Sequence, residues 1–142
     1  MTNATRTRGA LGVVEQWLTA VNARDGARVE SLSQEQVDIV GPRGRGSAPR
    51  AVLSEWLARS GFSSQPLRWF CGGDGLVVVE QDATWHDPAT GEPQDSFRIG
   101  SLFRVDDGRV ARYERFDDGV AGALAAAGLD AARDEVTRPV SP

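Results

Sequence analysis

The side chains that could transfer a proton are few in this sequence. His86 is the single histidine, and imidazole is the side chain that ordinarily changes charge near neutral pH. It directly precedes an Asp-Pro pair, a position typical of a histidine that caps a turn or lies at the rim of a site. Asp38, inside the short apolar run of residues 37–40, is the candidate carboxylate base. We therefore expect any acid–base role to fall to His86 or Asp38 at a rim.

Arg115 is the candidate anion-binding residue. Its planar guanidinium can hold a carboxylate, a phenolate or another acidic oxygen through paired N–H groups. Tyr113 could add a hydroxyl donor for the same oxygen. The alternative for Arg115 is a structural ion pair with Asp38, Glu114 or Asp117.

Several other kinds of chemistry have no support in the sequence. One histidine and one cysteine, Cys71, cannot make a metal site unless carboxylates supply the remaining ligands. All sixteen basic residues are arginine, so mechanisms that need a lysine nucleophile or base are excluded. The sequence contains no G-x-S-x-G motif, no Cys–His pairing and no dinucleotide-binding fingerprint. We expect neither a metal nor a cofactor.

Composition and charge limit the possible binding partners and the cellular compartment of the protein. The 142 residues fit a single domain of ordinary globular composition. A net charge of −4, with arginines spread along the chain, argues against nucleic acid as a partner. No apolar run approaches membrane-spanning length, and residues 1–10 have no signal-peptide core. The single cysteine agrees with these patterns in predicting a cytoplasmic protein that has no membrane partner.

Hydrophobic periodicity predicts helices first and strands second. Helices are expected over residues 10–23, 26–32 and 49–57, and strands over 37–40, 66–71, 76–86, 95–105 and 110–116, followed by a short helix over 120–127. The glycine-rich residues 41–46 are expected to form an irregular rim loop. This order predicts an α+β domain over residues 10–127, with a flexible N-terminus (1–9) and a C-terminal tail (128–142).

Alternation along the strands predicts which side chains face the helices. On the two longest strands the more apolar rows also carry Gln81 and Ser101, so these polar groups should point into an apolar interior. There they would bond to each other, to water or to backbone, or meet a ligand. The opposite rows carry Glu80 and Asp82 beside Arg98, a pattern that cross-strand ion pairs explain.

Three segments together resemble NTF2-like domains. They are V-V-E-Q-W-L-T-A-V-N-A-R-D (13–25), V-V-V-E-Q-D-A-T-W (77–85) and L-F-R-V-D-D-G-R-V-A-R-Y-E-R-F-D (102–117). This superfamily includes ketosteroid isomerases, SnoaL-type polyketide cyclases and limonene-epoxide hydrolases. The resemblance implies a cone-shaped, curved antiparallel sheet packed on about three N-terminal helices around a pocket for a small hydrophobic molecule. It also implies a homodimer through the outer face of the sheet, where Leu76, Val78 and Leu102 would need cover.

The catalytic residues of these relatives are not present at the corresponding positions of this sequence. Where isomerases have a tyrosine and two aspartates, this sequence has Trp17, Val40 and Ser101. Limonene-epoxide hydrolases have an Asp-Arg-Asp set; here Gln81 stands at the arginine position, Ala83 at the neighbouring aspartate and Arg115 at the last aspartate. The cyclase aspartate also falls close to Arg115, and a shift along the strand would substitute Glu114 or Asp117.

The resemblance nevertheless implies a ligand pocket, and two hypotheses for its function stay open. Its ligand-binding residues would be Trp17, Val40, Trp56, Gln81, Trp85, Ser101 and Tyr113, with Arg115, Asp38 and His86 as catalytic candidates. The first hypothesis is a SnoaL-like domain that binds a small, partly hydrophobic metabolite and isomerises, cyclises or hydrates it. The second is a non-catalytic ligand-binding or dimerisation module. A buried, unpaired carboxylate or imidazole in the pocket would favour the first.

Overall fold

The computed structural model describes residues 3–41 and 44–136 of the chain. In chain order its elements are α1 (Asn3–Asn22), α2 (Gly26–Ser31), β1 (Ser33–Gly41), β2 (Gly44–Pro49), α3 (Ala51–Ser60), β3 (Phe62–Cys71), β4 (Leu76–His86), β5 (Pro93–Asp106), β6 (Arg109–Phe116), α4 (Val120–Ala127), α5 (Ala131–Asp134) and β7 (Glu135–Val136). Among the described residues, no helix is long and apolar enough to cross a membrane.

The strands form one curved sheet in the order β2-β1-β6-β5-β4-β3-β7. Strands β3 to β6 are a meander, and β6 ends beside β1 as the sheet's one parallel pair within the described residues. The tight turn between β5 and β6 has positive φ at Asp107 and Gly108, 52° and 75°, as a type I′ turn requires. The structure therefore confirms an α+β domain with a curved sheet.

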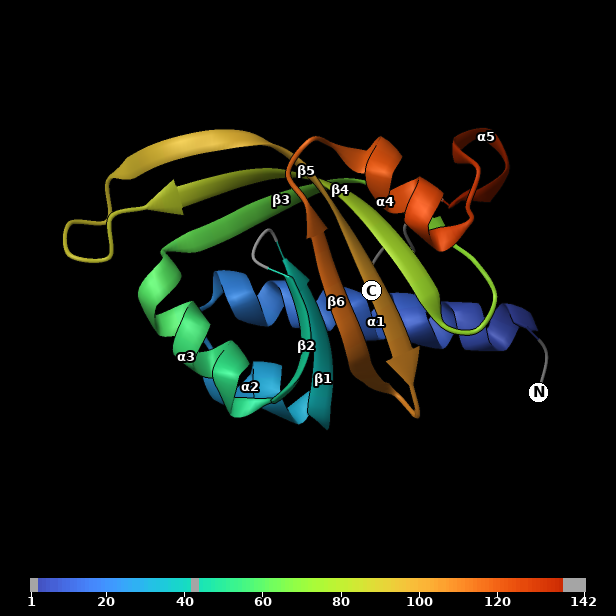
Figure 1. The fold of residues 1–142 in the computed structure, drawn as a ribbon, viewed down its shortest axis with the longest axis horizontal. Helices are drawn as coiled ribbons and strands as arrows, with labels where there is room; N and C mark the ends of the chain where they lie inside the picture. The colour runs from blue at the N-terminus through green and yellow to red at the C-terminus, as the bar shows by residue number, and fades with distance from the viewer. Residues whose placement is uncertain (1–2, 42–43, 137–142) are drawn as a thin grey trace.

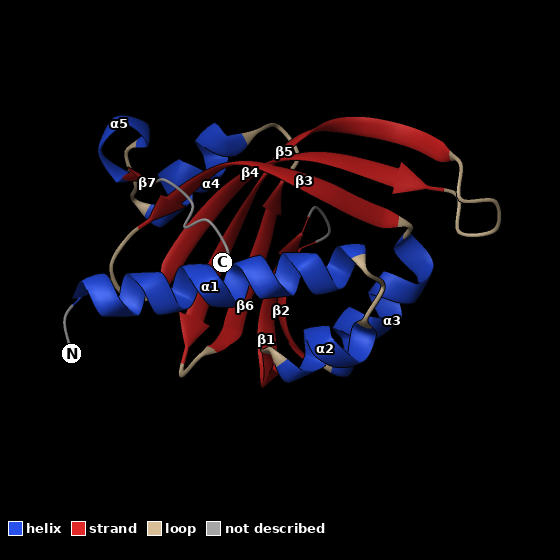
Figure 2. Cartoon of the chain, turned by 180° about the vertical axis from the view of Figure 1, so that it is seen from behind, coloured by secondary structure: helices blue, strands red, loops and turns tan. Residues whose placement is uncertain are grey.

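Helix α1 crosses the concave face of the sheet, and α2 and α3 cover one end of it (Figure 2). The main hydrophobic core lies between α1 and this inner face. Trp17 is at its centre, with ring centroids 5.2 Å from Phe103 and 5.3 Å from Tyr113. The rows predicted to face the helices do so, since Val79 of β4 and Ile99 of β5 are both fully buried in this core.

The outer face carries a second, smaller core that corrects one expectation. Val78 and Leu102 are buried there under Ala123 and Leu124 of α4, and Leu76 packs against the same cluster. Figure 1 shows α4 lying over β4 and β5 on this side. The apolar patch expected to be covered by a second copy is therefore covered by the chain's own helix. The expectation of a homodimer loses that support.

Several element boundaries also differ from those predicted. β1 begins at Ser33 and reaches Gly41, and β2 follows at Gly44, so the expected rim loop is mostly a hairpin, with residues 42–43 outside the described part. Pro49 ends β2 instead of starting α3. Helix α1 starts at Asn3, and β7 pairs with β3, so part of the expected N-terminus and tail is regular structure.

Gly100 of β5 is what allows α4 to dock closely on the sheet. A Cβ at this position would lie 2.7 Å from the Val120 Cα atom and 2.9 Å from the Gly119 carbonyl oxygen. We expect Gly100→Ala to lower the free energy of unfolding by about 1–3 kcal/mol, because backbone atoms must move apart. Gly12 of α1 is the matched control, since a Cβ there meets nothing within 4 Å. Gly12→Ala should instead stabilise by up to about 1 kcal/mol in urea unfolding. Equal effects of the two changes would contradict this account of α4.

Candidate functional site

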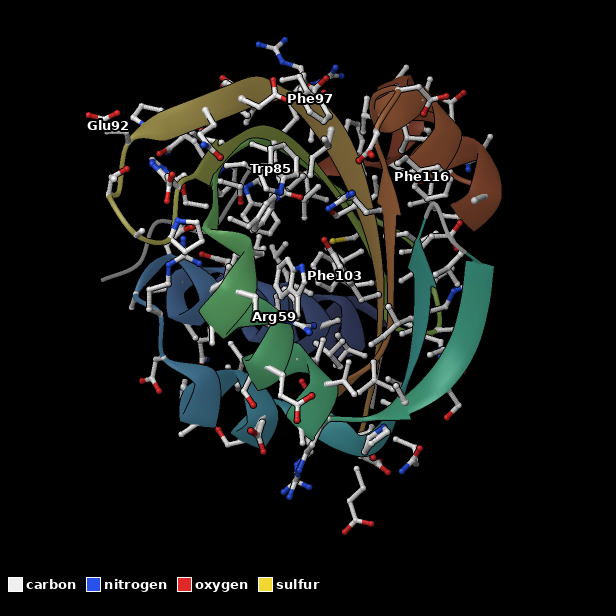
Figure 3. The ribbon with its side chains drawn as sticks, turned by 60° about the vertical axis from the view of Figure 1, so that its left-hand side comes forward. Arg59, Trp85, Glu92, Phe97, Phe103 and Phe116 are labelled. Carbon is white, nitrogen blue, oxygen red and sulfur yellow. The ribbon has the colours of Figure 1, made fainter. Side chains whose placement is uncertain are left out.

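The candidate site lies at one end of the concave face, where α3 and the strands β4, β5 and β6 approach one another. Figure 3 views this end past α3, with Phe97 and Trp85 near the top and Phe103 toward the centre. We call its fully or nearly buried residues the floor and its more exposed residues the wall. The floor consists of Trp17, Gln81, Ser101, Phe103 and Tyr113, and the walls of Ile39, Trp56, Trp85, Phe97 and Arg115.

A chain of hydrogen bonds crosses the floor. The Ser101 hydroxyl donates to Gln81 Oε1 at 2.5 Å, and Gln81 Nε2 donates to the Ser64 hydroxyl oxygen at 2.6 Å. Asn22, at the end of α1, holds the Ser64 backbone from both sides: its Oδ1 accepts from the Ser64 N–H at 3.0 Å and its Nδ2 donates to the Ser64 carbonyl at 2.8 Å. The two inward polar residues predicted from alternation are therefore bonded to each other.

Tyr113 is the titratable group of the floor. The residue is 8% exposed, and it lies on the same face of the sheet as Ser101 of the neighbouring strand β5. Burial raises the pKa of the Tyr113 phenol above its usual 10.0, while the Arg115 charge and the Ser101 hydroxyl oppose the rise by favouring the phenolate. Asp117 adds a smaller contribution in the raising direction. Tyr113 is thus a neutral hydroxyl at physiological pH.

Arg115 lies on the same inner face, because it pairs directly with Ser101 across β5 and β6. Its Nε and Nη2 atoms donate to the two carboxylate oxygens of Asp117, at 2.7 Å and 3.3 Å. The guanidinium also lies over the Trp85 ring, 5.3 Å from its centroid. The structural ion pair that the sequence left open is therefore present. The Nη1 N–H groups lie outside it, on a side chain that is 21% exposed.

Aromatic rings form a row from α3 to the open edge of β5. Trp56 and Phe62 have ring centroids 5.5 Å apart, Phe62 and Trp85 5.2 Å, and Trp85 and Phe97 4.8 Å. The last pair is stacked at an angle of 21°, and Phe97 is 37% exposed. Phe62 is buried within this row, so the apolar surface beside the Arg115 charge comes from the stacked Trp85 and Phe97 rings.

The structure separates the other predicted residues from this group. Asp38 and Val40 lie on the side of β1 that faces away from the core, while Ile39 packs against it. Asp38 is exposed and pairs in register with Arg112 of β6. Ile39 is the wall residue that the sequence comparison missed, although strict alternation from the buried Val37 would have indicated it.

His86 lies apart from this group and lines a hollow. Its Nδ1 lies 3.2 Å from the Gly91 carbonyl, which can only accept, and its Nε2 lies 3.1 Å from the Ser63 hydroxyl. The histidine thereby fixes the β4–β5 turn, as its position before Asp-Pro suggested. The hollow beside it has a volume of about 610 Å³ and lies between α3, the α1–α2 turn and this β-turn. Its lining consists of Arg24, Gly26, Ser54, Leu57, Ala58, Gly61, His86, Asp87, Pro88 and Gly91, and so includes none of the floor or wall residues.

The described residues contain no ready acid–base pair and no metal cluster. Within residues 3–41 and 44–136, no group of three or more His, Cys, Asp or Glu side chains could hold a metal ion. The buried polar residues of the same part of the chain are Ser33, Ser64, Gln81 and Ser101. The Ser33 hydroxyl accepts a hydrogen bond from the Trp17 indole N–H at 3.1 Å. Burial raises the pKa of the single cysteine, Cys71, to about 11, so its thiol stays protonated near neutral pH. Among the residues whose burial the structure describes, the inner face holds no buried carboxylate or imidazole.

Comparisons with known proteins agree with the architecture. A family model described as a SnoaL-like domain matches residues 14–113. No curated protein matches the sequence. Among solved structures, an LEH-like epoxide hydrolase of M. tuberculosis superposes with a TM-score of 0.66 at 22% identity, over 86% of this chain and 96% of the other.

Two further structures are similar. A ketosteroid isomerase candidate from Kribbella flavida superposes with a TM-score of 0.64 at 18% identity, over 78% of each chain. A polyketide cyclase candidate from Sinorhizobium meliloti gives a TM-score of 0.60 at 20% identity, over 73% of this chain and 93% of the other. At these identities the similarity establishes the fold.

Proposed function

The chain belongs to the SnoaL-like domain family, and from this premise we propose that it binds a small, partly hydrophobic metabolite with an acidic oxygen at the concave end of its sheet. The structural neighbours, named for steroid, polyketide and epoxide chemistry, support a ligand with a hydrophobic body. The observation that carries the proposal is the position of Arg115, a partly accessible guanidinium on the inner face beside an aromatic wall.

Arg115 would supply the polar end of the site. Two of its N–H groups are used by Asp117, which aims the guanidinium and leaves the Nη1 side for a ligand oxygen. A carboxylate or phenolate is the natural partner for such a fork. The Trp85 and Phe97 rings would cover the hydrophobic body of the same ligand.

The residue types in the floor favour ligand binding without acid–base catalysis. General-base catalysis needs a group whose protonation changes near working pH and which reaches the substrate. The buried polar residues in the described part of the chain are serines and a glutamine, and they are hydrogen-bonded. The exposed Asp38 and the turn-fixing His86 lie outside this group, so their predicted catalytic roles gain no support from their positions.

A second candidate function is a cofactor-independent isomerase, cyclase or hydratase. The observation that favours it is the pair Tyr113 and Arg115, a neutral hydroxyl and a cation on one face, which could stabilise an oxyanion formed from a carbonyl substrate. In that case the substrate itself or a water molecule would have to act as the base. A homodimer and a cytoplasmic location stay predictions.

The experiment that tests the proposed function is calorimetric titration with benzoate and with benzyl alcohol. Both have the same ring, and only benzoate carries an acidic oxygen. We expect benzoate to bind more tightly, because it alone forms a charge-assisted contact with Arg115. Equal affinities, or an affinity for benzoate that persists in Arg115→Ala, would contradict the proposal.

A further inference from the structure

The ion pair between Arg115 and Asp117 uses only one edge of the guanidinium. The Asp117 carboxylate accepts from Nε at 2.7 Å and from Nη2 at 3.3 Å, and these two atoms form the side-on fork of the planar group. The end-on fork consists of Nη1 and the remaining N–H of Nη2, and this pair does not use it. A ligand bound end-on would therefore share one guanidinium with the Asp117 carboxylate.

Asp117 also changes the charge that such a ligand meets. Within the described part of the chain, its carboxylate forms an ion pair with Arg115 and with no second cation. Its charge reaches the floor of the site, where it acts against Arg115: Arg115 lowers the pKa of the Tyr113 phenol and Asp117 raises it. A ligand at the end-on fork thus meets an ion pair with no net charge instead of a lone cation.

We propose that Asp117 sets the charge selectivity of the site, offsetting the Arg115 charge so that the end-on fork accepts a singly charged oxygen group, such as a carboxylate or a phenolate, in preference to a phosphate dianion. This inference rests on the proposed function and narrows its ligand class to unphosphorylated acids. Asp117 acts through Arg115 and is therefore a positioning and specificity residue.

The preference follows from how the opposing energies grow with the charge of the ligand. Attraction to Arg115 and repulsion by Asp117 are both proportional to that charge, so the carboxylate cancels much of the extra attraction that a dianion would gain. The cost of taking the ligand out of water rises more steeply, as the square of its charge in the Born treatment. The Trp85 ring lies against the guanidinium, 5.3 Å from it, and keeps water from that side. A dianion therefore loses more on leaving water than it regains at the site.

The test compares benzoate with phenyl phosphate by calorimetric titration at about pH 8, where the phosphate is a dianion because its second pKa is about 6. We expect the unaltered protein to bind benzoate at least as tightly as phenyl phosphate. Asp117→Asn keeps an acceptor oxygen for Arg115 and removes the charge, so the affinity ratio should move toward phenyl phosphate by about five-fold or more. The ratio is the decisive readout, because a variant that merely loosened Arg115 would weaken the dianion at least as much as benzoate.

Two further variants serve as controls. Asp117→Glu keeps the charge and should keep the ratio of the unaltered protein. Asp82→Asn is the matched control, since Asp82 forms a similar ion pair with Arg98 at 3.2 Å on the outer face, and the ratio should stay unchanged. An unchanged ratio in Asp117→Asn, an equal shift in Asp82→Asn, or a preference of the unaltered protein for phenyl phosphate would overturn the inference.

If Asp117→Asn does not fold, methyl phenyl phosphate decides the question with the unaltered protein. This ester keeps the phosphoryl group and carries a single charge, so we expect it to bind at least as tightly as phenyl phosphate, and tighter binding of the dianion would overturn the inference. Arg115-dependent binding of benzoate with an unchanged ratio in Asp117→Asn would overturn the charge selectivity and leave the proposed function intact. Failure of both benzoate and phenyl phosphate to bind would overturn the two together.

Discussion

Trp17→Ala is expected to lower the free energy of unfolding by about 3–5 kcal/mol, the usual range for truncating a buried tryptophan. The Trp17 side chain is 1% exposed and fills the space between α1 and the sheet, against Phe103 and Tyr113. Truncation would also leave the buried Ser33 hydroxyl without the indole N–H that it now accepts. Urea unfolding followed by circular dichroism measures the change.

Trp56→Ala provides the control for this prediction. Trp56 belongs to the partly buried wall, where water already reaches part of the ring, so its truncation should cost clearly less than that of Trp17. An equal or larger loss for Trp56 would show that the assignment of Trp17 to the core and Trp56 to the wall is wrong.

The second large effect is expected on ligand affinity. Arg115→Ala should weaken the binding of benzoate by about 1.5–3 kcal/mol, the usual contribution of a hydrogen bond to a charged group. Arg115→Lys should recover little, because an ammonium group cannot reproduce the planar fork that holds Asp117 and the ligand together. Calorimetric titration gives the affinity, and thermal unfolding of the same variants gives the stability.

The two quantities separate a binding role from a structural one. If Arg115 serves only to hold the end of β6 through Asp117, its loss should lower the melting temperature and leave the affinity intact. Arg98→Ala is the matched control, since Arg98 makes a similar pair with Asp82 at 3.2 Å on the outer face. That variant should leave the benzoate affinity unchanged.

Local periodicity in the sequence is enough to predict several features of the fold and of the candidate site. The apolar stripe of α1 fixes Trp17 in the core, and the alternation of β4 and β5 turns Gln81 and Ser101 inward. Positive-φ turn residues such as Asp107 mark the ends of the strands. Each of these depends on neighbours within a few residues, so one sequence suffices to predict it.

The parts that the sequence did not predict depend on long-range packing. Whether the outer patch around Val78 is covered by α4 or by a second chain depends on how closely α4 approaches Gly100. The faces of Ile39 and Val40 are a different case, because strict alternation from Val37 already places Ile39 toward the core. Alternation alone was overridden there by a family resemblance that placed Val40 inward.

The pairing of Arg115 with Asp117 was predictable in part, because it involves both a local contact and long-range packing. Both partners lie two residues apart, and the ion pair was one of the stated alternatives. What the sequence could not show is that the same guanidinium also lies on the Trp85 ring and on the face of Ser101. The registers of β4 against β5 and of β5 against β6 together bring these groups to one place.

The most direct test of the central claim is a two-dimensional nuclear magnetic resonance titration of the ¹⁵N-labelled protein with benzoate. We predict that the largest shifts appear at the Trp85 indole N–H, the Arg115 Nε–H and the backbone amide of Ser101. Shifts centred instead on the hollow lined by Gly61, His86 and Gly91, or no shifts anywhere at millimolar benzoate, would contradict a binding site on the concave face.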